Sequence, residues 1–282
     1  HGEKTPSFVV YPETESFYCF GCGAGGEVIN FIRRIENLDF MEAVKLLADR
    51  AGMQMPQESY DDGLVKLKNR VLEANRAAAK FYYSMLFTKE GEKAYNYLKG
   101  RALADKTIKH FGLGYAPSSV HALVDSLRNQ GFTEKELIEA NLAFKSARGF
   151  TVDRFIDRVM FPIIDLRGNV IAFGGRIMTD EKPKYLNTSD TLAFKKSHNL
   201  FALNFAKGVA GRKLILAEGY MDVIALHQTG FCNAVATLGT SLTEEQAVIM
   251  KRYADEVVIC YDADEAGQKA ASRAITILRK AG

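Results

Sequence analysis

Apolar residues recur along the chain with two periods, one typical of helices and one typical of strands. Helical spacing marks residues 28–35, 40–51, 64–86, 91–98, 107–111, 120–130 and 133–140. Two pairs of β-prone runs, each joined by turn residues, occupy residues 7–11 with 16–20 and residues 159–165 with 170–174. The pattern therefore predicts two hairpins separated by a helical segment, which contains a turn at residues 112–117.

The last third of the chain alternates short apolar runs with helical ones. Strands are predicted at residues 213–217, 232–236 and 256–261, and helices at residues 220–228, from residue 243, and at 265–279. This spacing implies a parallel sheet with right-handed crossovers. A polar and acidic stretch at residues 53–62 is typical of a linker, so the expected fold class is α+β multidomain.

Composition sets the broad class of protein. The chain has 282 residues, of which 47% are apolar and 25% charged, as in ordinary globular proteins. No apolar run approaches the ~20 residues that span a bilayer, and no signal peptide is evident. We expect a soluble, cytoplasmic protein with no membrane partner, built from two or three units.

Positive charge is concentrated in the middle of the chain. Residues 145–212 hold 12 Lys and Arg against 6 Asp and Glu, and the rest holds 25 against 28. Such a segment could hold a phosphate backbone. An ordinary solvated surface is the alternative that charge alone leaves open.

Two of the four cysteines form a metal-binding pattern. Cys19 and Cys22 make a C-x-x-C followed by glycines, whose backbone permits the tight turns that let two thiolates face one ion. His1 supplies a third zinc ligand across the first hairpin, which predicts a zinc ribbon. A redox pair or a chance spacing are the alternatives. Cys232 and Cys260 lie in apolar runs and are expected to be core residues.

The second hairpin is followed by cations interleaved with aromatic residues. Gly174-Gly175 lets the backbone approach a neighbour closely and presents Arg176, and residues 184–187 and 194–197 add lysines beside rings. This alternation suits a surface that holds phosphates with cations and packs bases or sugars against rings. A hairpin with scattered surface cations is the alternative.

Three acidic residues follow predicted parallel strands. Glu218 comes directly after one strand, and Asp262 and Asp264 come after another. Ligands of parallel sheets gather outside the carboxyl ends of the strands, and converging carboxylates repel one another unless a cation lies between them. Hard oxygen ligands favour Mg²⁺ or Mn²⁺. The alternative is that these acids only cap turns and helices.

Residues 1–8, 19–23 and 26–31 resemble the N-terminal zinc-binding domain of bacterial DnaG-type primases. The resemblance implies that Zn²⁺ is held by His1, Cys19, Cys22 and a cysteine three residues before His1. It also implies that this ribbon reads the single-stranded template.

Residues 153–163, 173–176, 183–187 and 194–197 are similar to the basic motifs of the primase polymerase core. The resemblance implies that matching residues hold template, primer and incoming nucleotide, namely Arg154, Arg158, Arg176, Lys184 and Lys196. Arg101 also matches, although Ala102 stands where the family usually has glycine. Lys195 departs from some family members and is ranked lower.

Residues 218–223, 236–240 and 261–267 resemble the TOPRIM domain of these primases, and Asp222 fits its Glu-Gly-x-x-Asp pattern. The resemblance implies that Glu218, Asp262 and Asp264 are catalytic and bind Mg²⁺ or Mn²⁺. A further Asp-x-Asp motif is expected beyond Gly282.

Taken together, these resemblances imply a DNA primase, which makes short RNA primers for replication by two-metal-type nucleotidyl transfer. The expected units are a zinc ribbon at residues 1–55, a linker at 56–63, a mixed α/β basic subdomain at 64–210 and an α/β TOPRIM subdomain at 211–282. Expected partners are single-stranded DNA, ribonucleoside triphosphates, the RNA primer and, beyond Gly282, a replicative helicase. DNA cleavage by a TOPRIM topoisomerase or nuclease and a non-catalytic nucleic-acid adaptor are the competing hypotheses.

Overall fold

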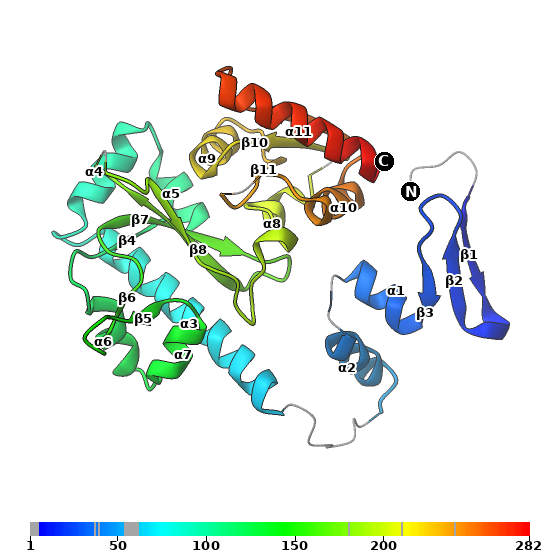
Figure 1. Cartoon of the computed structure of the whole chain (residues 1–282), viewed down its shortest axis with the longest axis horizontal. Coiled ribbons are helices and arrows are strands. Elements are labelled where there is room, and N and C mark those ends of the chain that lie inside the picture. The colour runs from blue at the N-terminus through cyan, green and yellow to red at the C-terminus, as the bar shows by residue number, and fades with distance from the viewer. Residues whose placement is uncertain are drawn as a thin grey trace. The chain divides into compact units, whose positions relative to one another are not determined.

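The computed structural model describes residues 6–36, 38, 40–53, 62–179, 181–209, 211–239 and 241–282. The chain divides into two compact units, His1–Asp62 and Gly63–Gly282 (Figure 1).

The N-terminal unit is a small antiparallel sheet followed by two helices. Strands β1 (Phe8–Tyr11), β2 (Ser16–Cys19) and β3 (Gly25–Glu27) pair in the order β1-β2-β3, and the 3₁₀ turn Pro12–Thr14 closes the first hairpin as predicted. Helices α1 (Val28–Ile35) and α2 (Phe40–Arg50) follow. The core is a cluster of rings, in which Phe17 lies 5.5 Å from Phe8 and 5.3 Å from Phe31 between centroids.

The larger unit begins with helices and then builds an antiparallel sheet. The helices are α3 (Asp62–Leu86), α4 (Glu92–Gly100), α5 (Asp105–Phe111), α6 (Ala122–Arg128) and α7 (Glu134–Glu139). The sheet has the order β4-β7-β8-β9, with β4 Gly114–Ala116, β7 Arg158–Ile164, β8 Val170–Ile177 and β9 Tyr185–Asn187. A small hairpin of β5 (Ala143–Lys145) and β6 (Thr151–Asp153) lies apart from this sheet.

The turn predicted at residues 112–117 was wrong, because three of those residues form strand β4. Gly114 pairs with Met160 of β7, and a Cβ on Gly114 would come within 2.6 Å of the Tyr82 backbone. The glycine therefore permits close packing of a buried strand against α3. It does not mark a turn.

The C-terminal part forms the predicted parallel sheet. After the 3₁₀ turn Lys196–His198 and the short helix α8 (Leu203–Ala206), the order is β10 (Lys213–Ala217), α9 (Tyr220–Gln228), β11 (Ala234–Ala236), α10 (Glu244–Tyr253), β12 (Glu256–Cys260) and α11 (Glu265–Ala281). The strands lie in the order β11-β10-β12, and both pairs are parallel. The central strand β10 contributes buried leucines to the core beneath α10 and α11.

The prediction that Cys232 and Cys260 are core residues was wrong. Both are exposed. Cys232 lies in the turn before β11, and Cys260 ends β12, an edge strand along which residues alternate between exposed and half-buried. An apolar run identifies a strand, but it does not tell whether a neighbouring element covers both of its faces.

The antiparallel sheet and the parallel sheet share one core through Tyr220. Its ring stacks on Phe161 at 5.2 Å, and its hydroxyl donates a hydrogen bond to Asn187 Oδ1 at 2.8 Å. Gly174 makes this contact possible, because a Cβ there would lie 2.6 Å from the Tyr220 ring. The residues at the ends of β8 and β9 are thereby fixed relative to α9. None of the helices described has the length and apolar character needed to cross a bilayer.

Candidate active site and nucleic-acid interface

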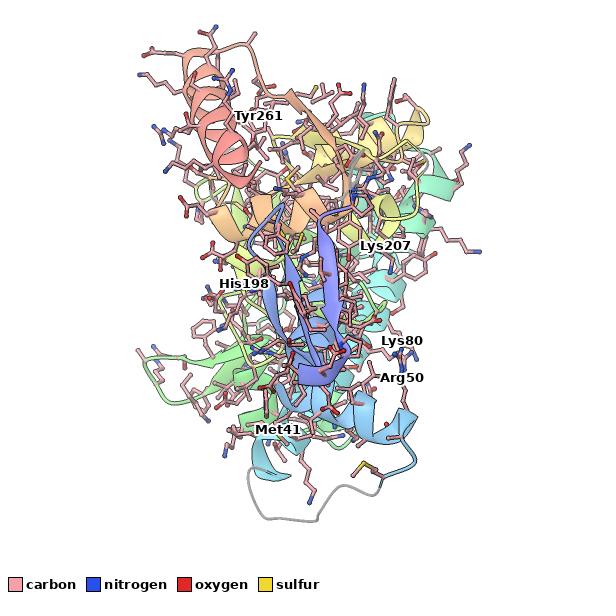
Figure 2. The ribbon with its side chains drawn as sticks, turned by 90° about the vertical axis from the view of Figure 1, so that its right-hand side faces the viewer. Met41, Arg50, Lys80, His198, Lys207 and Tyr261 are labelled. Carbon is pink, nitrogen blue, oxygen red and sulfur yellow. The ribbon has the colours of Figure 1, made fainter. Side chains whose placement is uncertain are left out.

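Two of the predicted acidic residues meet at the carboxyl end of the parallel sheet. Glu218 follows β10 and Asp262 follows the neighbouring strand β12, with Tyr261 (labelled in Figure 2) between that strand and Asp262. Glu218 Oε2 accepts a hydrogen bond of 3.1 Å from the backbone N–H of Asp262. Both residues are exposed, so the Glu218 carboxylate meets the backbone of Asp262 at a place that solvent and ligands can reach.

Asp264 has a different local role. Its Oδ1 accepts a hydrogen bond of 2.7 Å from the backbone N–H of Gly267 and so caps the N-terminus of α11. The turn is tight, since a Cβ on Gly267 would lie 2.1 Å from the Asp262 carbonyl oxygen. Within the described ranges, no three acidic, cysteine or histidine side chains are gathered as a metal-binding group. The contact that the structure shows for Asp264 is therefore a helix cap, which is the alternative to metal binding that the sequence left open.

Negative charge is nonetheless concentrated at this edge of the sheet. Asp222, in the first turn of α9, accepts a hydrogen bond of 3.0 Å from the Gly219 N–H. Partial desolvation raises the pKa of the Asp222 carboxyl, and the negative charge of Asp262 raises that pKa further. Burial and the charge of Glu218 likewise raise the pKa of Tyr261. Carboxylate oxygens that repel one another fit the donor chemistry of a hard divalent cation.

Arg176 lies beside this acidic edge and is almost fully buried, with 7% of its surface exposed. Its Nη1 donates a hydrogen bond of 2.6 Å to the Tyr185 hydroxyl, and its guanidinium carbon lies 5.2 Å from the Tyr185 ring centroid and 5.5 Å from that of Tyr97. The positive charge of Arg176 lowers the pKa of Asp222, against the larger upward effects. Basic and acidic residues from the two sheets therefore share one electrostatic environment.

Two other predicted arginines, one directly after β6 and one at the start of β7, are partly or almost fully buried. Arg158 is 9% exposed, and its Nη1 donates hydrogen bonds of 3.2 Å to the carbonyl oxygens of Gly175 and Pro183. Arg154 is half-buried, and its Nε is buried without a hydrogen-bond partner among the described residues. The contacts of Arg158 join the backbone of β8 to the segment that carries Lys184.

The remaining predicted cations lie nearer the surface. Lys184 and Arg101 are exposed and Lys196 is half-buried. The guanidinium of Arg101 lies 5.7 Å from the Tyr97 ring centroid. The backbone of Lys196 is held by Asp190 Oδ1 and by the Gln246 amide, at 3.0 Å each. No sequence pattern indicates that Tyr97 lies near both Arg101 and Arg176. The pattern of lysines beside rings includes Tyr185 but does not predict its contact with Arg176.

The C-x-x-C pair lies at the end of the ribbon hairpin, in a loop that favours a thiolate. Hydrogen bonding to Ser7 lowers the pKa of the Cys19 thiol, and the backbone amides of Cys22 and Gly21 add to this effect against opposing burial. Gly23 adopts a left-handed conformation (φ +67°), and its N–H returns to the Cys19 carbonyl oxygen at 2.8 Å. Such a turn fits zinc thiolate chemistry. His1, the third predicted ligand, lies outside the described residues.

Three segments of the chain each match a known protein family. Residues 215–282 match a family described as Toprim-like, and residues 1–62 match one described as a CHC2 zinc finger. The protein therefore combines a zinc ribbon with a Toprim sheet. Residues 81–207 match the family described as DNA primase catalytic core, N-terminal domain. The chain belongs to the bacterial DnaG-type DNA primases.

Relatives named DNA primase match nearly the whole of this chain. The DNA primase of Clostridium acetobutylicum is 46% identical over 100% of this chain and 47% of its own length. The Deinococcus radiodurans DNA primase is 45% identical over 96% of this chain and 47% of its own length. The chain thus spans about half the length of the curated relatives it matches.

Solved structures agree with this assignment. A crystal structure of the zinc-binding and RNA polymerase domains of the Aquifex aeolicus primase is 39% identical, with a TM-score of 0.71, over 100% of this chain and 68% of that one. A DnaG primase catalytic domain bound to single-stranded DNA is 36% identical, with a TM-score of 0.69, over 75% of this chain and 67% of that one.

Proposed function

We propose that this protein makes short RNA primers on single-stranded DNA for replication, by metal-dependent nucleotidyl transfer. The main supporting observation is that Glu218 contacts Asp262 at the end of the parallel sheet, while Arg176, from a different sheet, lies near enough to Asp222 to lower the pKa of that carboxyl. Carboxylates beside a preorganised cation suit phosphoryl chemistry, in which the protein positions the reactants and stabilises charge. The family assignment and the neighbour bound to single-stranded DNA support this function.

We assign the divalent cation, Mg²⁺ or Mn²⁺, to Glu218, Asp262 and Asp264. When bound, such an ion supplies charge neutralisation for the triphosphate and activation of the attacking 3′-hydroxyl. Asp264 would contribute while its Oδ1 still caps α11, because a carboxylate has a second oxygen. Asp222 keeps the Gly219 turn in place beside Glu218.

The basic residues are assigned to the phosphates of template, primer and nucleotide. Arg101, Arg154, Arg176, Lys184 and Lys196 would contact these phosphates, which positions the strands without reading their sequence. We assign Arg158 an indirect part, because its hydrogen bonds hold the carbonyl oxygens on either side of the segment that leads to Lys184.

The ribbon is proposed to hold Zn²⁺ through His1, Cys19, Cys22 and a cysteine upstream, and to contact the single-stranded template. We propose the boundaries 1–55 for the ribbon, 56–63 for the linker, 64–210 for the basic subdomain and 211–282 for the Toprim subdomain. A replicative helicase, reached through a region beyond Gly282, and a cytoplasmic location complete the proposal.

The test of catalysis is Glu218→Gln in a version of the protein extended at both ends to the length of its relatives. Single-stranded DNA, labelled ribonucleotides and Mg²⁺ or Mn²⁺ are combined, and the products are separated by length. We expect short, template-dependent RNA from the unaltered protein and a loss of at least roughly 100-fold in rate from the variant, because a metal ligand is removed.

Glu256→Gln is the matched control. Glu256 begins the neighbouring strand β12, at the opposite end of the sheet, where it pairs with Lys213 at 3.0 Å on the surface. This variant should make RNA at the unaltered rate. Absence of RNA from a folded, metal-loaded, unaltered protein would overturn the primase proposal, and a covalent protein–DNA adduct would favour DNA cleavage.

A further inference from the structure

We infer that Tyr97 is a positioning residue, whose ring sets the spacing of Arg101 and Arg176 for binding a nucleic-acid phosphate backbone. The inference rests on the proposed function, because it assigns a role in binding the template. Among the described contacts, Tyr97 touches no carboxylate of the acidic edge. We expect its ring, and not its hydroxyl, to be needed for binding DNA.

Two guanidinium groups share the Tyr97 ring. The guanidinium carbon of Arg101 lies 5.7 Å from the ring centroid, and that of Arg176 lies 5.5 Å from it. Arg101 follows Tyr97 by one helical turn at the end of α4, whereas Arg176 comes from β8. One ring thus joins a cation on a helix to a cation on the central sheet.

The ring offsets an unfavourable pair of charges. Two guanidinium groups near one aromatic ring repel each other, and the repulsion is poorly screened where Arg176 is buried. The negative face of an aromatic ring attracts both cations. The ring can therefore hold the two arginines at a fixed spacing before any polyanion arrives, which reduces the conformational entropy lost on binding.

The hydroxyl of Tyr97 has no part in this arrangement. Its oxygen is buried without a hydrogen-bond partner among the described residues. The orientation of Arg176 is otherwise fixed by Nη1, which donates to Tyr185, while its Nε is buried and also lacks a partner. Ring contact is thus the interaction that the structure shows between Tyr97 and the two arginines, so phenylalanine should serve as well as tyrosine.

A second contact fixes the Arg101 end of this arrangement to the Toprim subdomain. Gln228, the last residue of α9, donates from Nε2 to the Ala102 carbonyl oxygen at 2.8 Å and accepts at Oε1 from the Ala104 N–H at 2.8 Å. Helix α9 also carries Asp222. The shared ring and the Gln228 bridge together hold the two arginines at a set place relative to the acidic edge.

The experiment compares Tyr97→Phe with Tyr97→Leu in the extended protein. Binding of a fluorescent single-stranded DNA is measured by anisotropy, and kcat and KM for the template are measured in the primer assay. Tyr97→Leu should raise both the Kd for DNA and the KM for template about 5- to 30-fold, the range expected when a desolvated cation–π contact is lost. The value of kcat should stay within about threefold, because the interaction is made before the chemical step.

Tyr95→Leu is the matched control, because Tyr95 lies on the same helix and its ring is near Lys99, at 6.0 Å, without a described contact to Arg101 or Arg176. This variant and Tyr97→Phe should keep the unaltered Kd and KM. If Tyr97→Leu lowers kcat and thermal stability while Kd and KM stay unchanged, the residue is merely structural and the inference is wrong. Equal losses from the Phe and Leu variants would also overturn it.

The binding measurement separates this inference from the primase proposal. If the unaltered protein makes no RNA, the proposed function fails, but the Kd values still decide whether the Tyr97 ring supports DNA binding. If the unaltered protein makes RNA and Tyr97→Leu binds DNA normally, the inference fails and the proposed function stands.

Discussion

Ala102 holds a left-handed backbone conformation, with φ +59°, directly after Arg101. Residues with a Cβ are disfavoured there by roughly 1–2 kcal/mol, whereas glycine adopts this conformation freely. The conformation ends α4 and directs the Ala102 carbonyl oxygen to Gln228. A single backbone angle thus contributes to the place of the Arg101 side chain.

Ala102→Gly should therefore stabilise the larger unit by about 0.5–1 kcal/mol, after the entropic cost of glycine is subtracted. The urea midpoint of residues 63–282, followed by circular dichroism, measures the change. Ala104→Gly is the control, because Ala104 is extended at φ −76°. Ala104→Gly should lower the free energy of unfolding by a similar amount. If both variants shifted the urea midpoint equally in the same direction, the left-handed conformation of Ala102 would not be the cause.

Strand β8 is the element that joins the two halves of the site. Gly174 accepts the Tyr220 ring of α9, Gly175 lies against Phe155, and Arg176 extends toward Tyr97 and Tyr185. Consecutive residues of the strand face opposite sides of the sheet. Gly174 and Arg176, two positions apart, therefore lie on the same side of the sheet. The strand contacts helix α9 through Gly174 and presents Arg176 beside that contact.

Gly174→Ala should destabilise the larger unit by about 1–3 kcal/mol, because the added methyl group would overlap the buried Tyr220 ring. It should also weaken DNA binding at temperatures where the protein is still folded, since the ring must shift. Chemical denaturation and anisotropy measure the two effects. Gly208→Ala, where an added Cβ meets nothing within 4 Å, should change stability by less than about 0.5 kcal/mol.

At the scale of the whole molecule, the two compact units differ in what stabilises them. The larger unit has extensive apolar clusters, whereas the described part of the first 62 residues has few buried apolar side chains, such as Phe17, Ile32 and Ala43. A unit of about 60 residues buries a smaller fraction of its surface than a larger domain and is only marginally stable. A structural zinc ion would add its binding free energy to the stability of this unit.

Zinc removal should therefore unfold the N-terminal unit alone. A strong chelator added to the extended protein should abolish its unfolding transition, while the transition of residues 63–282 should stay within about 2 °C. Cys22→Ser should reproduce the effect of the chelator, and Cys232→Ser, also at an exposed cysteine, should not. A chelator effect on both transitions would contradict independent units.

Local sequence patterns by themselves determined much of this protein. The C-x-x-C hairpin, the strand–helix alternation after residue 213 and the place of Glu218 and Asp262 after strands all followed from the sequence. They follow because side-chain periodicity and turn residues record which face of each segment is buried. The parallel sheet then brings the two strand ends together without further information.

The tertiary structure decided the rest. The short strands β4 and β9 exist because β7 and β8 pair with them, and their few residues carry no clear period of their own. Packing between distant segments likewise decided that Cys260 lies on an exposed edge strand and that Tyr97 meets an arginine 79 positions away. A sequence pattern shows that a face or a charge needs a partner, but the partner is chosen only when the elements pack.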